Sequence, residues 1–273
     1  MNKVSIPLFF FIMMILGSCN AQKPSSEIAT SISYPMSDSH IEKSDQALIT
    51  VDYLMGKFDP AQHQEFMLIP PKYRDEELRY IRKDVFQSFV LMYEAAAKEG
   101  IFLKIRSATR NFENQKRIWE NKWTGKTILE DNINAAADIK DDLKRAKKIL
   151  EYSSMPGTSR HHWGTDMDFN AFDNTWFESG EGLLLYTWLI NHASEYGFCQ
   201  PYTKMGSDRK TGYFEEKWHW TYLPVSTKLT EQAKLNLKNE MISGFLGAET
   251  AAKIDVVQNY ILGISPACTS TKN

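Results

Sequence analysis

Two segments of the chain concentrate side chains that could bind a metal ion and move a proton. The first contains His161, His162 and Asp168, and the second contains Glu216 and His219. Neutral imidazole nitrogens and carboxylate oxygens are zinc ligands, and a catalytic zinc site uses three of them and leaves one position for water. Zinc lowers the pKa of such a water to about 7, and a nearby carboxylate can then accept its proton. The residue types predict a hydrolytic metal site, but domains without a metal also contain them.

The spacing of these residues is more specific than their types. The pattern Ser-x-His-x-x-Gly-x-x-x-Asp runs from Ser159 to Asp168. The pattern Glu-x-Trp-His runs from Glu216 to His219. Two further motifs lie outside these segments, so the resemblance does not depend on one match.

The upstream motif is Ser-Ala-Thr-Arg, which ends at Arg110 and is followed by Gln115 five residues later. A Tyr-Gly-Phe element occupies residues 196–198. Taken in this order, the motifs resemble those of the VanY-type zinc D-alanyl-D-alanine carboxypeptidases. The resemblance covers about residues 80–222.

The resemblance implies a role for each matching residue. His161, Asp168 and His219 become the zinc ligands. Glu216 becomes the general base that activates water and later protonates the leaving amine. Arg110 faces the developing oxyanion or the substrate carboxylate, a role that suits its planar guanidinium.

The same resemblance makes Ser159 and Gln115 candidate substrate-binding residues. The chain also departs from the family pattern, because Asp166 replaces a usual alanine and Lys217 a common proline. Strand alternation would place Asp166 on the same face as the proposed ligand Asp168. A second carboxylate there would either compete for the metal or point elsewhere.

Two adjacent histidines require a choice between them. Successive residues of an extended segment point to opposite faces, so His161 and His162 do not both coordinate easily. The family pattern selects His161, and we expect His162 at the surface. The side chains of Glu216 and His219 are three residues apart, so they would share a face of a helix but not of a strand. Placing both at one site therefore predicts a bend near Lys217.

Helical periodicity alternates with short strand-like runs. The predicted helices cover residues 84–99, 111–122, 140–152, 182–196, 227–241 and 248–262. The predicted strands cover residues 101–105 and 214–222, and the aromatic run 172–177 is expected in the core. There is no βαβ rhythm, which favours an α+β fold with a small antiparallel sheet and packed helices. The resemblance implies the fold shared by D-Ala-D-Ala peptidases and the Hedgehog signalling domain.

The N-terminus has the pattern of an export signal. Lys3 precedes an apolar run over residues 6–16, which is shorter than the roughly 20 residues of a membrane-spanning helix. The following Leu-Gly-Ser-Cys ends at Cys19 and resembles the bacterial lipobox, in which the cysteine is lipidated. The alternative is an ordinary signal peptide cleaved near Ala21.

This interpretation divides the chain into four parts. Residues 1–19 form a lipoprotein signal peptide with Cys19 as the lipidation site, and 20–45 a polar, serine-rich tether. Residues 46–265 form the zinc peptidase domain and 266–273 a tail. We therefore expect an exported protein, lipid-anchored to a bacterial membrane and facing the cell envelope.

Two cysteines then remain, and both alternatives for them stay open. Cys199 and Cys268 either form a disulfide, as exported proteins permit, or stay as thiols. The charge is balanced, with 32 basic and 34 acidic residues in 273, so no nucleic-acid partner is indicated. The oligomeric state is not specified by any pattern.

The expected function is zinc-dependent removal of a terminal D-amino acid, D-alanine, from peptidoglycan stem peptides. The same metal site would also serve an L,D-carboxypeptidase or a cell-wall endopeptidase. A non-catalytic zinc-bearing binding module is the other alternative. Glu216 favours an enzyme, because a binding module has no chemical need for a general base.

Overall fold

A four-stranded antiparallel sheet joins segments that lie far apart in the sequence. In the computed structural model, which describes residues 49–270, the strand order is β3-β4-β6-β5. The strands are β3 (Ile105–Ser107), β4 (Asp166–Phe169), β6 (His219–Tyr222) and β5 (Phe198–Cys199). A separate hairpin pairs β1 (Phe66–Leu68) with β2 (Tyr80–Arg82). This arrangement confirms the predicted α+β fold with a small antiparallel sheet.

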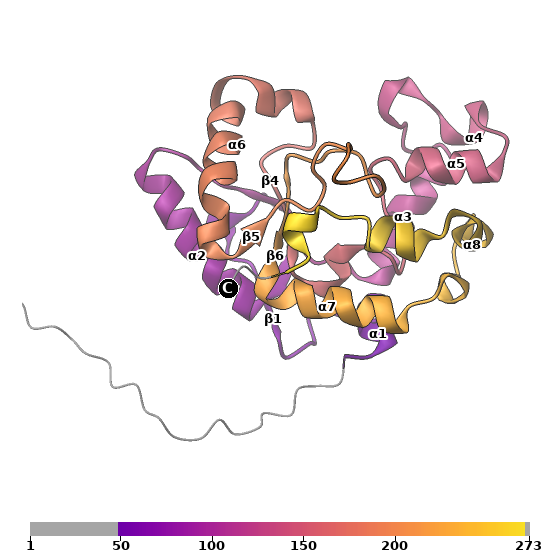
Figure 1. Cartoon of the computed structure of the whole chain (residues 1–273), viewed down its shortest axis with the longest axis horizontal. Coiled ribbons are helices and arrows are strands. Elements are labelled where there is room, and N and C mark those ends of the chain that lie inside the picture. Colours follow the sequence, from indigo (N-terminus) through magenta and orange to yellow (C-terminus); the bar gives the residue numbers. More distant parts are fainter. Residues whose placement is uncertain (1–48, 271–273) are drawn as a thin grey trace, which may run out of the picture. The chain divides into compact units, whose positions relative to one another are not determined.

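Helices pack on both sides of this sheet (Figure 1). The helices are α1 (Val51–Leu54), α2 (Lys83–Lys98), α3 (Phe112–Trp123), α4 (Ala135–Asp138), α5 (Asp142–Ile149), α6 (Gly180–His192), α7 (Leu223–Asn236) and α8 (Ala251–Ile254). One hydrophobic core contains α2 and α6 and one face of the sheet. The other core contains α1, α3, α5, α7 and α8.

The two faces of β4 and β6 differ in chemistry. Met167 and Phe169 of β4 and Trp220 of β6 are buried in the core formed with α2 and α6. Side chains alternate along a strand, so Asp168 and its cross-strand partner His219 lie on the opposite face. The sheet therefore separates an apolar core from a polar face that also carries buried charges.

Most predicted elements are present with shifted ends. The Asn111 side chain caps α3 by accepting a hydrogen bond of 2.9 Å from the Asn114 N–H, as its residue type predicts. Helix α7 starts at Leu223 rather than at 227, because Pro224 fits the first turn of a helix. The predicted helix 248–262 is interrupted at Asp255, which adopts a left-handed conformation with φ of 53°.

Both predicted strands are present, but with wrong bounds. The strand expected over 101–105 lies at Ile105–Ser107, because residues 101–104 leave α2 in a turn and are held by Asn170. The strand expected over 214–222 is only His219–Tyr222, since the chain turns between Glu216 and His219. That turn confirms the bend predicted near Lys217.

The C-terminal segment belongs to the folded domain. Cys199 in β5 forms a disulfide with Cys268, and their Cα atoms are 5.7 Å apart. Pro266–Cys268 forms a 3-10 turn, Cys268 is fully buried, and the Ser265 N–H bonds to the Pro201 carbonyl at 2.8 Å. Residues 266–268, which the sequence assigned to a tail, are thus covalently attached beside β5.

The remaining N-terminal expectations fall outside the described residues. The signal peptide over 1–19, Cys19 and the tether over 20–45 all precede residue 49. Within residues 49–270, no helix combines the length and apolar character needed to cross a bilayer.

Candidate metal centre and active site

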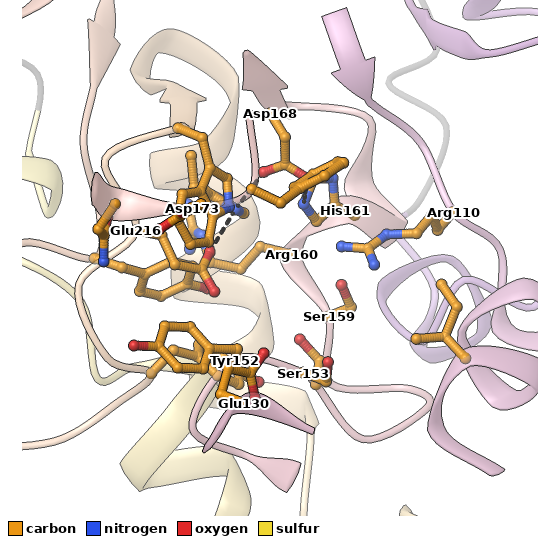
Figure 2. Close-up of a pocket in the computed structure, with 18 of the residues that line it drawn as sticks. Arg110, Glu130, Tyr152, Ser153, Ser159, Arg160, His161, Asp168, Asp173 and Glu216 are labelled. Carbon is orange, nitrogen blue, oxygen red and sulfur yellow. Dashed lines mark ion pairs between the residues drawn. The ribbon is translucent and has the colours of Figure 1, made fainter. Parts of the chain in front are cut away.

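Three buried side chains converge on one point of the polar face of the sheet. His161 lies in the 3-10 turn Arg160–Trp163, Asp168 in β4 and His219 directly opposite Asp168 in β6. His161 Nε2 is 3.3 Å from Asp168 Oδ2, and His219 Nδ1 is 3.1 Å from Asp168 Oδ1. One potential ligand atom from each residue lies within 4.8 Å of the other two. Folding therefore brings together the three residues predicted as ligands, of which Figure 2 labels His161 and Asp168.

Each imidazole has one nitrogen held by an acceptor behind it. His161 Nδ1 is 2.8 Å from the Ala108 carbonyl oxygen, and His219 Nε2 is 2.8 Å from Asp166 Oδ2. Since a carbonyl and a carboxylate only accept, these nitrogens carry the hydrogens. The opposite nitrogens are then free to coordinate, which is the usual arrangement of metal-binding histidines.

The donor set fits a zinc ion. Two imidazole nitrogens and one carboxylate group face one another, and three such ligands are the number that a catalytic zinc site uses. Asp168 Oδ1 is buried, and its 3.1 Å contact with His219 Nδ1 is not a hydrogen bond when the His219 hydrogen is on Nε2, so this oxygen accepts none from the described residues 49–270. A buried carboxylate oxygen without a hydrogen bond is costly, and a bound cation would remove that cost.

The Glu216 carboxylate lies beside this group without belonging to it. Its Oε2 is 3.2 Å from His219 Nδ1, and its backbone N–H donates to the Tyr202 carbonyl at 2.9 Å. The Gln200 amide donates to the carbonyls of Glu216 and Tyr202 at 3.1 and 3.2 Å. Burial raises the pKa of Glu216, while its bond to His219 lowers it. The turn thus holds a proton acceptor at the edge of the three-residue group.

Arg110 lines the same pocket from the segment before α3. Its guanidinium forms no ion pair and no hydrogen bond with the described residues. Burial lowers its pKa, and the nearby Asp168 and Glu216 carboxylates oppose that effect. In Figure 2 the guanidinium points toward the space beside His161. An unpaired guanidinium in this position can bind a carboxylate or an oxyanion.

The surface position expected for His162 was wrong. The side chain is fully buried, with Nδ1 2.6 Å from the Arg110 carbonyl oxygen and Nε2 accepting from the Gly157 N–H at 3.0 Å. Burial lowers its pKa to about 3, so the ring is neutral. A Cβ on Gly56, whose φ is +72°, would lie 2.4 Å from His162 Nδ1. His162 therefore holds the backbone of Arg110 and requires a glycine beside it.

The two candidate substrate-binding residues have different positions. Ser159 lines the pocket, and its hydroxyl is buried without a hydrogen-bond partner in the described part of the chain. Gln115 is fully buried outside the pocket lining, where its amide donates to the Ser154 carbonyl at 2.8 Å. The structure thus gives Ser159 access to a ligand and gives Gln115 a supporting contact to the pocket wall.

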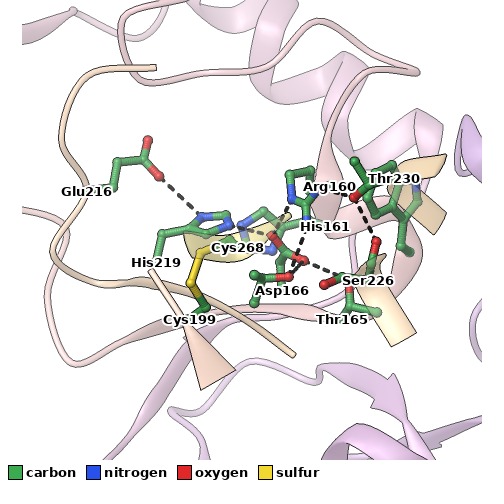
Figure 3. Close-up of polar contacts among 12 residues, drawn as sticks. Arg160, His161, Thr165, Asp166, Cys199, Glu216, His219, Ser226, Thr230 and Cys268 are labelled. Carbon is green, nitrogen blue, oxygen red and sulfur yellow. Dashed lines mark hydrogen bonds and ion pairs between the residues drawn. A yellow bond between two sulfur atoms is a disulfide. The ribbon is translucent and has the colours of Figure 1, made fainter. Parts of the chain in front are cut away.

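Asp166 does point to the same face as Asp168, but it lies behind His219 rather than beside the open site. Its Oδ2 accepts from His219 Nε2 at 2.8 Å and from Arg160 Nε at 3.1 Å (Figure 3). Its Oδ1 accepts from the hydroxyls of Thr165 and Thr221 at 2.7 Å each. All of these contacts are buried, so Asp166 orients a proposed ligand instead of competing for the metal.

The pocket in front of these groups has a volume of about 410 Å³ and includes residues that no motif identified. The segment 172–175 lines it, although the aromatic run was expected in the core. Phe172 is 52% exposed, whereas Phe177 is buried as predicted. The Asn174 side chain bonds to the backbone of Glu215 and Lys217 at 2.7 and 3.1 Å. This segment therefore braces the turn that carries Glu216.

Comparison with known proteins places the chain in a family. Residues 78–225 match the VanY family, described as D-alanyl-D-alanine carboxypeptidase. A putative carboxypeptidase, YodJ, of Bacillus subtilis is 31% identical over 185 residues, which cover 65% of this chain and 59% of that protein. A D-alanyl-D-alanine carboxypeptidase of Enterococcus faecalis is 26% identical over 146 residues, which cover 52% and 48%. The chain thus spans about half of the length of these curated relatives.

Two solved structures are similar at a lower level. The LdcB LD-carboxypeptidase is 25% identical, with a TM-score of 0.47, over 66% of this chain and 76% of that one. VanYB in complex with D-alanine-D-alanine is 22% identical, with a TM-score of 0.43, over 67% and 90%. The family match itself covers more than half of the chain, including the candidate metal group formed by His161, Asp168 and His219. The chain belongs to the VanY family of D-alanyl-D-alanine carboxypeptidases.

Proposed function

We propose that this protein is a zinc-dependent carboxypeptidase that removes the terminal D-alanine from peptidoglycan stem peptides. The observation that carries the proposal is the convergence of His161, Asp168 and His219, with Glu216 3.2 Å from His219 and Arg110 unpaired in the same pocket. A binding module needs neither a non-ligand carboxylate at this position nor an unpaired guanidinium beside it.

The proposed zinc would be held by His161, Asp168 and His219. When bound, zinc supplies a Lewis acid that makes water a better nucleophile at neutral pH. Glu216 faces the group from outside the ligand set, so its carboxylate is free to take a proton from the attacking water. It can then deliver that proton to the departing amine. The contacts of Gln200 and Asn174 keep the Glu216 turn in place during both transfers.

Arg110 and Ser159 would bind the end of the peptide. The guanidinium of Arg110 supplies a charged, planar donor for the terminal carboxylate or the developing oxyanion. The Ser159 hydroxyl is a buried donor and acceptor without a protein partner among the described residues. Because His162 contacts the Arg110 carbonyl at 2.6 Å, the backbone from which this side chain extends is positioned before the substrate binds.

Hydrolysis of purified muropeptides, followed by mass spectrometry, tests the proposal. We expect loss of one terminal alanine from pentapeptides, abolished by a chelator and restored by added zinc. Loss of alanine from tetrapeptides instead would indicate an L,D-carboxypeptidase, and conversion of cross-linked dimers to monomers an endopeptidase. If zinc binds but no peptide is cleaved, the protein is a binding module and the proposed mechanism is wrong.

We also propose that the protein is exported and lipid-anchored through Cys19, on the sequence pattern alone. Replacing Cys19 with serine should move the protein out of the membrane fraction or leave its signal peptide uncleaved. Normal processing together with unchanged membrane association in Cys19→Ser would contradict the anchor.

A further inference from the structure

The wall of the pocket remote from the metal group carries two opposite charges. Ile118 and Lys122 occupy one face of α3, since residues four apart in a helix are neighbours, and both line the pocket. Glu130 lines it from a turn after α3. In Figure 2, Glu130 and Tyr152 lie at the end of the pocket opposite Asp168. The pocket therefore has a second polar end.

The charged side chains at this end, Lys122 and Glu130, are not paired with other side chains of the described residues. Arg160, the other cation of the pocket lining besides Arg110 and Lys122, is paired with Asp166 at 3.1 Å. Within residues 49–270, the Lys122 ammonium forms neither an ion pair nor a hydrogen bond, and Glu130 forms no ion pair. Lys122 is half-buried, so it loses hydration without gaining a protein partner. A charge in this state binds an added anion well, because part of its desolvation has already occurred.

The two charges also lie within electrostatic reach of each other. Burial lowers the pKa of Lys122, and the Glu130 carboxylate is the largest opposing influence. The turn that presents Glu130 is anchored by the buried Leu129, whose N–H bonds to the Ile133 carbonyl at 2.8 Å. Asp131 and Asn132 in this turn adopt φ values of 59° and 60°, which these residue types tolerate. The backbone that carries Glu130 is thus held in a defined conformation, and its exposed carboxylate faces the pocket that Lys122 also lines.

We propose that Lys122 and Glu130 select a substrate residue whose side chain ends in both a carboxylate and an ammonium group, as diaminopimelate does. Lys122 binds the carboxylate and Glu130 binds the ammonium. A lysine side chain satisfies only Glu130 and brings a second cation to Lys122. The proposal rests on the proposed function, because it assumes that a stem peptide occupies the pocket with its reacting end at the metal group.

The position of the pair in the pocket suits an internal residue of the peptide. Glu130 lies at the end of the pocket opposite Asp168 (Figure 2), and Lys122 lines the same pocket. With the terminal residue at the metal group and Arg110, the pair faces the side chain of a residue that precedes the terminal one.

Equilibrium binding to the zinc-loaded Glu216→Gln variant tests the selection without requiring turnover. The probes are three synthetic pentapeptides that differ only at the third residue, which is lysine, meso-diaminopimelate or diaminopimelate with an amidated side-chain carboxylate. We expect the diaminopimelate peptide to bind about 10- to 100-fold more tightly than the other two, as expected for hydrogen bonds to a charged group. When Lys122→Met is added to this variant, the diaminopimelate peptide should bind within about twofold of the affinity of the other two.

Two further variants separate the pair from general effects of charge. Lys126→Met removes an exposed lysine that does not line this pocket, and it should keep the full preference. Glu130→Gln should weaken the lysine and diaminopimelate peptides together, since both carry the ammonium. Equal binding of the three peptides, or a preference that survives Lys122→Met, would overturn the inference.

Hydrolysis by the unaltered enzyme is then measured on the same peptides. Cleavage of all three at similar kcat/KM, without a difference in binding, would refute the selection and leave the carboxypeptidase function standing. Selective binding with no cleavage would support the selection and refute the carboxypeptidase function.

Discussion

Asp166 offers the sharpest test of how the chain builds its metal group. The carboxylate has four buried partners, which are His219, Arg160, Thr165 and Thr221. Only the contact with His219 acts directly on a proposed ligand. Asp166→Ala removes that acceptor, and Asp166→Asn keeps a neutral amide oxygen in nearly the same place.

The expected loss of zinc affinity follows from this geometry. The 2.8 Å bond fixes the His219 ring with its hydrogen on Nε2, which leaves Nδ1 to coordinate. Removing such a supporting carboxylate typically costs 10- to 100-fold in metal affinity. We expect about 100-fold for Asp166→Ala and about 10-fold for Asp166→Asn, which retains an acceptor without the charge.

The same substitutions should also reduce stability. The Arg160–Asp166 ion pair is completely buried on both sides, at 0% exposure. Breaking a buried pair by removing one partner leaves the other charge uncompensated and costs about 3–5 kcal/mol. Both Asp166 variants should therefore unfold at lower denaturant concentration than the unaltered protein, in the absence of metal.

Arg160→Gln is the matched control, because it breaks the same ion pair and leaves the bond between Asp166 and His219. Competition titration with a chromophoric chelator measures zinc affinity, and urea unfolding of the metal-free proteins measures stability. We expect similar losses of stability for Arg160→Gln and Asp166→Ala but a much smaller loss of zinc affinity for Arg160→Gln. Zinc affinity within twofold of the unaltered protein in Asp166→Ala would refute the orienting role.

Five further substitutions separate metal binding, catalysis and substrate binding. Glu216→Gln should reduce kcat on a cleaved muropeptide by about 10²- to 10⁴-fold with zinc retained, and Glu215→Gln should be nearly silent; the opposite result would place the general base one residue away. His161→Ala should abolish stoichiometric zinc in metal analysis, whereas His162→Ala should keep zinc but lose stability, since it leaves two buried backbone groups unbonded. Arg110→Lys keeps the charge but loses the planar fork, so kcat/KM should fall at least tenfold with normal zinc content, and activity within twofold would remove Arg110 from substrate binding.

The metal group could be predicted from the sequence because its spacing matches a known family. The patterns from Ser159 to Asp168 and from Glu216 to His219 resemble those of the VanY-type carboxypeptidases, and that resemblance implied which residues meet. The burial of His162 could not be predicted, because successive side chains of an extended segment point to opposite faces. The segment is a 3-10 turn, in which two successive side chains can both be buried against different partners.

The remote wall of the pocket had no sequence signal. Lys122 and Glu130 are ordinary charged residues of a helix and a turn, and only tertiary packing places them in one pocket. Phe172 lies in an aromatic run that hydrophobicity assigned to the core, yet it is exposed at the pocket. Composition does not report which end of an aromatic segment faces solvent, since that depends on the position of the neighbouring turn.

The hydrophobic face of the sheet determines the geometry of the metal group. Met167 of β4 pairs with Trp220 of β6, and both are buried in the core formed with α2 and α6. This pair fixes the register, because a slip by one residue would turn the apolar side chains of a strand to the opposite face. The same register places Asp168 opposite His219 and Asp166 two positions away, on the same side. Packing on the other side of the sheet thereby places Asp166 at Nε2 of His219 and Asp168 at its Nδ1.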